Sequence, residues 1–108
     1  MKSIPQYLFN SRGEWIAFRV DAYIFDTHGK WVGWLPWDPT TVVDVEGKYL
    51  GTIYAGSRLV KYADWEDRGD PGCPAYPQQP ETPGYPTLVH PVRLPAGAAD
   101  IVIAPKAA

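Results

Sequence analysis

The stretch that decides the fold is YIFDTHGKWVG, residues 23–33. Two variants of the same phrase flank it, YLFNSRGEWIA at 7–17 and TVVDVEGKYLG at 41–51. Each variant carries Asn or Asp at its centre, Gly three positions later, and β-forming residues on both sides. Asn or Asp first and Gly fourth are typical of a type I turn whose Gly takes a left-handed bulge position. Each phrase therefore predicts a β-hairpin.

Three hairpins in series predict an all-β fold, an antiparallel meander of about six strands. Pairing outward from each turn, we expect Phe9 opposite Trp15, Phe25 opposite Trp31 and Val43 opposite Tyr49. One pair further out, we expect Tyr7 opposite Ala17, Tyr23 opposite Gly33 and Thr41 opposite Gly51. A ring above a cross-strand Gly or Ala covers backbone that the small residue leaves bare.

Alternation along these strands predicts two apolar faces. One face holds the aromatic and small residues just paired. The other holds Leu8, Ile16, Phe18, Val20, Ala22, Ile24, Val32, Trp34, Val42 and Leu50. An antiparallel sheet usually leaves one face to water, and about sixty residues are too few to cover both. We therefore expect a symmetric homo-oligomer, in which identical subunits or a ligand cover the remaining apolar surface.

Composition changes near residue 64. The segment from there to the end holds nine of the twelve prolines, which excludes a helix or a central strand. We divide the chain into a hairpin repeat domain, 1–63, and an extended Pro-rich tail, 64–108, which packs on that domain or on a neighbouring subunit. Within the tail, DIVIA at 100–104 is a candidate short edge strand.

Charge and cysteine content exclude several classes of protein. A net charge of −2, with ten basic and twelve acidic residues scattered along the chain, gives no footprint for nucleic acid. One cysteine, Cys73, excludes an internal disulfide and a thiol-rich zinc site. No stretch predicts a signal peptide or a membrane span. We expect a soluble cytoplasmic protein without cofactors.

Nothing in the sequence indicates catalysis, and we expect no enzyme. His28 occupies a turn position, where a polar residue is ordinary, and His90 has no carboxylate or Cys near it in sequence. Cys73 lies between Gly and Pro and reads as a loop thiol rather than a nucleophile. The glycines occur singly in turns and do not form a phosphate-binding loop.

The candidate ligand-binding residues lie along the aromatic face, except Trp34, which lies on the other face. The segment EWIAFRVDAYIFD, 14–26, reads as one long strand that places Arg19 and Asp21 among aromatic residues. That charged pair is either an ion pair at a subunit contact or a grip for a ligand's polar head at a pore mouth. The aromatic residues are either core or a ligand channel, an ambiguity that extends to Trp37. The candidate ligand-binding residues are Trp15, Arg19, Asp21, Tyr23, Trp31 and Trp34.

The chain resembles a small bacterial family, the 4-fold β-flower domain. The resemblance rests on VVDVEGKYLGTIYAGSRLVKY, 42–62, with its Arg58-Leu59 pair, and on the Pro-rich stretch before LPAGAADIVI, 94–103. It extends from about Tyr7 to Val102. LPAG in place of PPG and the insert PWDPTT, 36–41, depart from the family pattern. The resemblance implies a homotetramer of hairpins around a four-fold axis with an apolar, pore-like centre, and no catalytic activity.

Two hypotheses follow. In the first, the chain is a binding module whose aromatic-lined cavity holds elongated hydrophobic or amphiphilic molecules such as acyl chains, polyethers or dyes. In the second, it is a structural or interaction module whose Pro-rich tail recruits a protein partner. A third, weaker hypothesis treats the Trp-containing hairpins as sugar-binding repeats, which the lack of a signal peptide disfavours.

Overall fold

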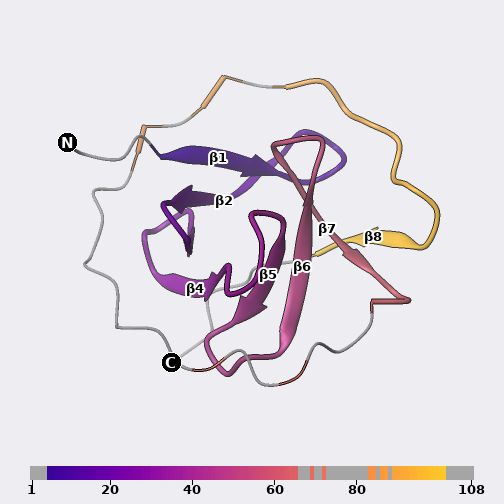
Figure 1. The fold of residues 1–108 in the computed structure, drawn as a ribbon. Helices are drawn as coiled ribbons and strands as arrows, with labels where there is room; N and C mark the ends of the chain where they lie inside the picture. The colour runs from indigo at the N-terminus through magenta and orange to yellow at the C-terminus, as the bar shows by residue number, and fades with distance from the viewer. Residues whose placement is uncertain are drawn as a thin grey trace.

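The structure, a computed structural model, describes residues 5–65, 69, 72, 83–84, 86–87 and 89–101. This part of the chain forms eight β-strands and no helix (Figure 1). The strands are β1 (Gln6–Phe9), β2 (Trp15–Val20), β3 (Tyr23–Asp26), β4 (Trp31–Trp34), β5 (Thr41–Asp44), β6 (Tyr49–Tyr54), β7 (Arg58–Tyr62) and β8 (Ala98–Asp100). The predicted all-β fold is confirmed.

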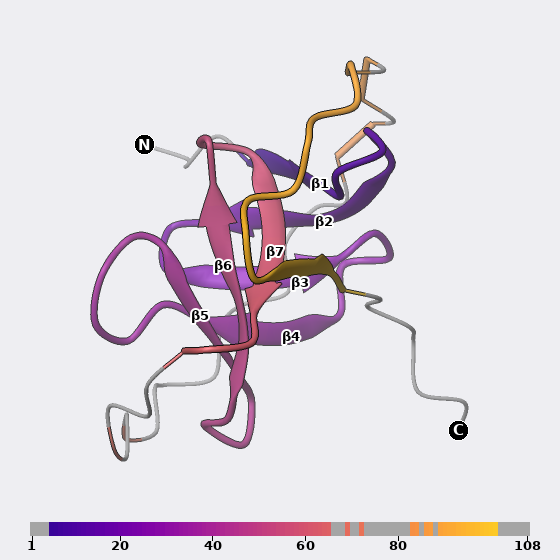
Figure 2. The same cartoon turned by 90° about the vertical axis from the view of Figure 1, so that its right-hand side faces the viewer.

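Each strand pairs antiparallel with the next, from β1 through to β8, as a meander requires. In addition, β1 meets β7 in parallel at Phe9 and Arg58, and the Phe9 amide donates to the Ser57 carbonyl at 2.8 Å. This contact closes seven strands into a barrel, which the sequence analysis did not anticipate. Strand β8 pairs with β7 beyond the point of closure (Figure 2). It begins two residues before the candidate strand 100–104, of which residues 102–104 lie outside the described residues.

The three predicted turns have the same hydrogen bonds. In each, the side-chain Oδ1 of the first residue, Asn10, Asp26 or Asp44, accepts from the amides two and four positions later, at 2.8 to 3.0 Å. The Gly in the fourth position has φ of 86°, 84° and 88°, a region that other residues rarely enter. Its amide donates to the carbonyl of the first residue. The turn prediction is therefore confirmed in all three hairpins.

A β-bulge follows every one of these turns. The pairs nearest the turns are as predicted, but the extra residues Ile16, Val32 and Leu50 then shift the register by one. The next pairs are Leu8 with Ala17, Ile24 with Gly33, and Val42 with Gly51. The predicted pairs Tyr7–Ala17, Tyr23–Gly33 and Thr41–Gly51 are wrong for this reason. Tyr7, Tyr23 and Thr41 instead face Phe18, Trp34 and Thr52.

The bulges also change which residues share a face. The small residues Ala17, Gly33 and Gly51 move to the inner face, and Phe18 and Trp34 move to the outer face. A Cβ on Gly33 would lie 2.4 Å from the Val43 carbonyl oxygen, so the closed sheet has no space for one there. The two faces are apolar as predicted, but the small residues line the interior instead of alternating with the rings.

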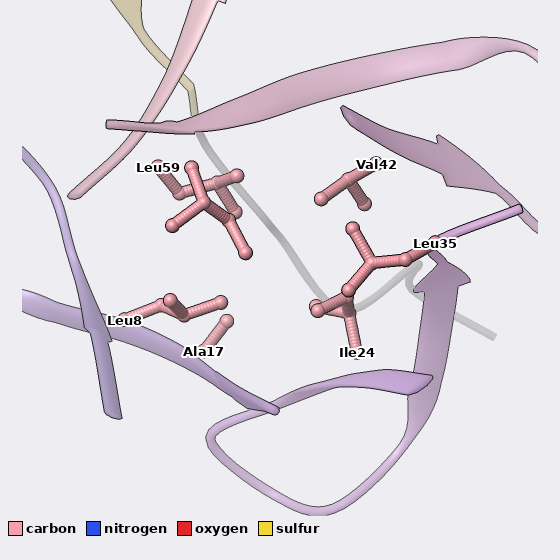
Figure 3. Packing of buried hydrophobic residues seen from close by; sticks show 7 residues of the cluster. Leu8, Ala17, Ile24, Leu35, Val42 and Leu59 are labelled. Carbon is pink, nitrogen blue, oxygen red and sulfur yellow. The ribbon is translucent and has the colours of Figure 1, made fainter. Parts of the chain in front are cut away.

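The barrel interior is filled with aliphatic side chains. They come from β1, β2, β3, β5, β6, β7 and the β4–β5 loop, and most of them are seen pointing toward one another in Figure 3. The cluster consists of Leu8, Ala17, Ile24, Leu35, Val42, Ile53 and Leu59. The bulge residues pack against it. Closure of the sheet therefore covers the inner face within one chain, without the second subunit that we expected an open sheet to need.

The described part of the tail lies outside the barrel and crosses the seam between β1 and β7 (Figures 1 and 2). Arg58, 7% exposed, donates from Nη1 to the Asn10 carbonyl at 3.1 Å and from Nη2 to the His90 carbonyl at 2.6 Å. The amide and hydroxyl of Ser11 donate to the two carboxylate oxygens of Asp100, at 2.7 and 2.6 Å. These bonds join the first hairpin, β7 and the tail. The division at residue 64 stays a prediction.

Candidate functional site

Four of the six predicted site residues lie together on the outer face of β2, β3 and β4. With Tyr7 of β1 they form what we call the aromatic band: Tyr7, Trp15, Tyr23, Trp31 and Trp34. The rings of Tyr7 and Trp15 meet edge to face, with centroids 5.5 Å apart and an angle of 80°. Tyr23 and Trp31 repeat the arrangement at 6.2 Å and 74°. All five residues are half-buried, so each still presents surface to a partner or a ligand.

The bulges fix the orientation of the two equivalent indoles. Trp15 Nε1 donates to the Ala17 carbonyl at 2.8 Å, and Trp31 Nε1 donates to the Gly33 carbonyl at the same distance. In each case the extra residue of the bulge lies between the Trp and the residue whose carbonyl accepts the bond. The bulge therefore brings that carbonyl within reach of the indole N–H. Because these N–H groups are satisfied within the chain, the exposed part of each ring is apolar.

Buried residues lie beside the band on the same face of the sheet. Phe18 and Phe25, cross-strand partners on β2 and β3, stack at 5.4 Å with an angle of 25° and are almost fully buried. Val43, which pairs with Trp34 across β4 and β5, is completely buried on the same face. The outer face therefore has buried apolar residues of its own, which are cross-strand partners of the band residues.

Arg19 and Asp21 do not belong to the band. The predicted long strand 14–26 is broken by a two-residue turn, in which Asp21 has φ of 54°. Because of the bulge, Arg19 shares a face with buried Ala17, at the end of the barrel. Its Nε donates to the Asp21 main-chain carbonyl at 2.7 Å and its Nη1 to the Pro39 carbonyl at 3.4 Å. The prediction that both residues lie on the aromatic face is wrong.

A second group of aromatic residues was only partly predicted from the sequence. Trp65, three residues beyond β7, stacks on Tyr49 with a centroid distance of 4.3 Å and an angle of 1°. Trp37 of the β4–β5 loop lies 6.0 Å from Trp65 at 30°. The sequence predicted Trp37 as a core or ligand-channel residue and Tyr49 only as the strand partner of Val43, and it assigned no role to Trp65. A signal existed: the third repeat has Thr41 where the first two have Tyr, which leaves Tyr49 without the corresponding ring.

The described residues offer no candidate metal centre. They contain no group of three or more His, Cys, Asp or Glu side chains placed to hold a metal ion. His28 and His90 are exposed, and they meet their hydrogen-bond partners through main-chain atoms, the His28 amide and the His90 carbonyl. Cys73 lies outside the described residues. Within the same portion of the chain, no helix is long and apolar enough to cross a membrane.

Comparison with known proteins gives one match. The family model described as 4-fold beta flower protein matches residues 6–98, which include every described strand through the first residue of β8. No curated protein and no solved structure matches the chain. The match includes Arg58 and Leu59, the pair on which the sequence resemblance partly rested.

Proposed function

Because this chain belongs to the 4-fold beta flower family, we propose that it is a non-enzymatic homotetramer that binds elongated hydrophobic or amphiphilic molecules. The observation that carries the proposal is the aromatic band. The barrel interior is packed with aliphatic residues, so the band is the surface on which these rings gather, and each is half-buried in the single chain.

Four-fold assembly would multiply this surface. A ring row contributed by each of four subunits around an axis gives a long apolar channel, in which an acyl or polyether chain replaces water at every ring. Orientation of the indoles by Trp15 Nε1 and Trp31 Nε1 lowers the entropy lost on binding, because two side chains are already fixed.

Assembly is tested first, by light scattering coupled to gel filtration at micromolar concentration. A tetramer gives about 48 kDa, four times the 12.0 kDa of the chain. A folded sample of about 12 kDa would contradict the proposed channel, because one band alone cannot enclose a chain-like ligand. Trp31→Ala and Trp34→Ala are then measured for assembly before any binding experiment, so that loss of the tetramer is not mistaken for loss of the ligand.

Binding is tested by titrating the tetramer with a lysophospholipid below its critical micelle concentration, by calorimetry and Trp fluorescence. We expect saturable binding, weakened about tenfold or more by Trp31→Ala or Trp34→Ala, since a tenfold change corresponds to about 1.4 kcal/mol of lost contact. Tyr54→Ala is the matched control, because Tyr54 is an exposed aromatic residue of β6 outside the band. Equal affinity in all four proteins would refute a role for the band.

The alternative, a tail that recruits a protein partner, finds less support. The described tail residues are bonded to the barrel: Gly84 accepts from the Tyr7 hydroxyl at 2.6 Å, and the Val92 amide donates to the Ser11 carbonyl at 2.7 Å. A segment held in this way is not free to act as a polyproline ligand.

A further inference from the structure

The third repeat differs from the first two in its aromatic partner. Trp15, Trp31 and Tyr49 occupy the same place, the outer residue beside each bulge. In the first two repeats the Trp pairs with a residue on the preceding strand, and the tyrosine two positions before that residue contacts the indole edge to face. The corresponding residue of the third repeat is Thr41, which is buried and has no ring. The ring of Tyr49 is therefore left for a partner from elsewhere.

Trp65 is that partner, and its geometry is different. It comes from beyond β7 rather than from the paired strand, and it lies flat on Tyr49 at 4.3 Å and 1° instead of edge to face. Trp37 adds a second ring contact at 6.0 Å and 30°. A parallel stack at this spacing is the geometry in which a flat aromatic ring binds to another. The chain thus presents a ring-binding surface with its own indole on it.

Tyr49 is held by more hydrogen bonds than Trp65, the ring that lies on it. The Tyr49 hydroxyl is 2.7 Å from Thr52 Oγ1 and accepts from the Tyr62 amide at 3.1 Å, so two hydrogen bonds fix the ring. Among the described residues, the Trp65 side chain makes these two ring contacts and no hydrogen bond. The main-chain bond nearest to it in sequence joins the Ala63 amide to the Gly97 carbonyl. Trp65 remains half-buried.

We propose that Tyr49 and Trp37 form a stacking site for a planar, uncharged aromatic molecule, and that Trp65 is an internal occupant which such a molecule displaces. Binding to an occupied site is weakened by the fraction of time the site is closed, so removal of Trp65 raises the apparent affinity. This site adjoins the aromatic band, because Val43 pairs with both Trp34 and Tyr49, but it does not depend on the function proposed for the band.

The probe is indole, the same ring that Trp65 places on Tyr49, and cyclohexanol is the control, because it has similar size and is not flat. The protein is labelled with 5-fluorotryptophan, and its five resonances are assigned with five single Trp→Phe variants. In the unsubstituted protein, we expect indole to shift the fluorine resonances of Trp65 and Trp37 saturably, and cyclohexanol to leave them unchanged. Shifts confined to the other three resonances would overturn the proposal.

Trp65→Ala provides the second measurement. We expect indole to bind this variant at least tenfold more tightly than the unsubstituted protein, and Trp65→Ala/Tyr49→Leu to lose that gain. The dispersion of the remaining fluorine resonances reports whether each variant is folded, and Trp65→Leu replaces Trp65→Ala where it is not. No gain in affinity, or an equal gain for cyclohexanol, contradicts an occupied stacking site. If a lysophospholipid shifts only the fluorine resonances of Trp15, Trp31 and Trp34, the result supports the aromatic band and not the stacking site. The two proposals can therefore fail independently of each other.

Discussion

Arg58 and His90 are 32 positions apart in the chain, yet Nη2 of Arg58 donates a 2.6 Å hydrogen bond to the His90 carbonyl. The other terminal nitrogen of the same guanidinium donates to Asn10, and the carbon between them lies 5.9 Å from the centre of the Phe9 ring. One buried side chain therefore joins the start of β7, the first hairpin turn and the tail at the place where the barrel closes.

Substituting Arg58 with Lys should destabilise the fold, because a single ammonium cannot reach both carbonyls in the geometry of a guanidinium. Hydrogen bonds from a charged donor are worth about 1.5–3 kcal/mol each, so we expect a loss of roughly 2–3 kcal/mol in urea unfolding. Arg93→Lys, at an exposed arginine of the same tail, is the control and should change little. Equal midpoints for the two variants would mean that the seam does not depend on Arg58.

Gly33→Ala should be the more damaging of two glycine substitutions. Its new Cβ would lie 2.4 Å from the Val43 carbonyl oxygen, whereas a Cβ on Gly84 would meet nothing within 4 Å. Overpacking of this kind costs about 1–3 kcal/mol, while Gly→Ala at an unstrained open position is neutral or stabilising by up to about 1 kcal/mol. Thermal unfolding of both variants measures the difference. If Gly33→Ala is as stable as Gly84→Ala, β4 and β5 accommodate the new Cβ without loss of stability.

Asp26→Asn and Asp26→Ala should separate the role of the turn oxygen from that of the charge. Asp26 is buried, and its Oδ1 accepts from the amides of His28 and Lys30. Asn preserves this acceptor, as Asn10 does in the first repeat, so we expect a change below about 0.5 kcal/mol. Ala leaves two amides without their acceptor and should cost on the order of 2 kcal/mol. Faster hydrogen exchange at those two amides in the Ala variant alone would identify the cause.

The bond between Ser11 and Asp100 should show a measurable coupling energy. A double-mutant cycle with Ser11→Ala and Asp100→Ala isolates the hydroxyl–carboxylate term, expected at about 1.5 kcal/mol because Ser11 is buried. The exposed ion pair Arg12–Glu14, 2.8 Å apart with side chains 71% and 60% exposed, is the comparison and should couple by less than about 0.5 kcal/mol. If the two coupling energies are equal, the contact between Ser11 and Asp100 contributes no more to stability than an exposed ion pair.

Sequence reasoning succeeded where the determinants are local. The capping oxygens and the left-handed glycines lie within five residues of one another, so the three turns and the pairs next to them could be predicted. The bulge could not, because the triplets WIA, WVG and YLG fit uninterrupted alternation equally well. One extra residue then reversed the face assignments later in the same strand, which is why Arg19 was placed among the rings.

The remaining errors have non-local causes. Closure depends on a contact between Phe9 and Arg58, and no periodicity within either strand indicates it. The β6–β7 turn places Ala55 at φ of 53°, a conformation that its residue type does not suggest. The Trp65 ring reaches Tyr49 from another segment of the chain. For the candidate site, the sequence identified most of the rings but not their grouping.

The seam sets the order in which the chain can mature on the ribosome. The barrel closes at Phe9 and Arg58, so its inner face is covered only after β7 has emerged. Until then the nascent chain holds finished hairpins whose apolar inner face is exposed to water, a state prone to pairing with neighbouring chains on the polysome. Strand β7 is therefore the segment whose synthesis ends this vulnerable period.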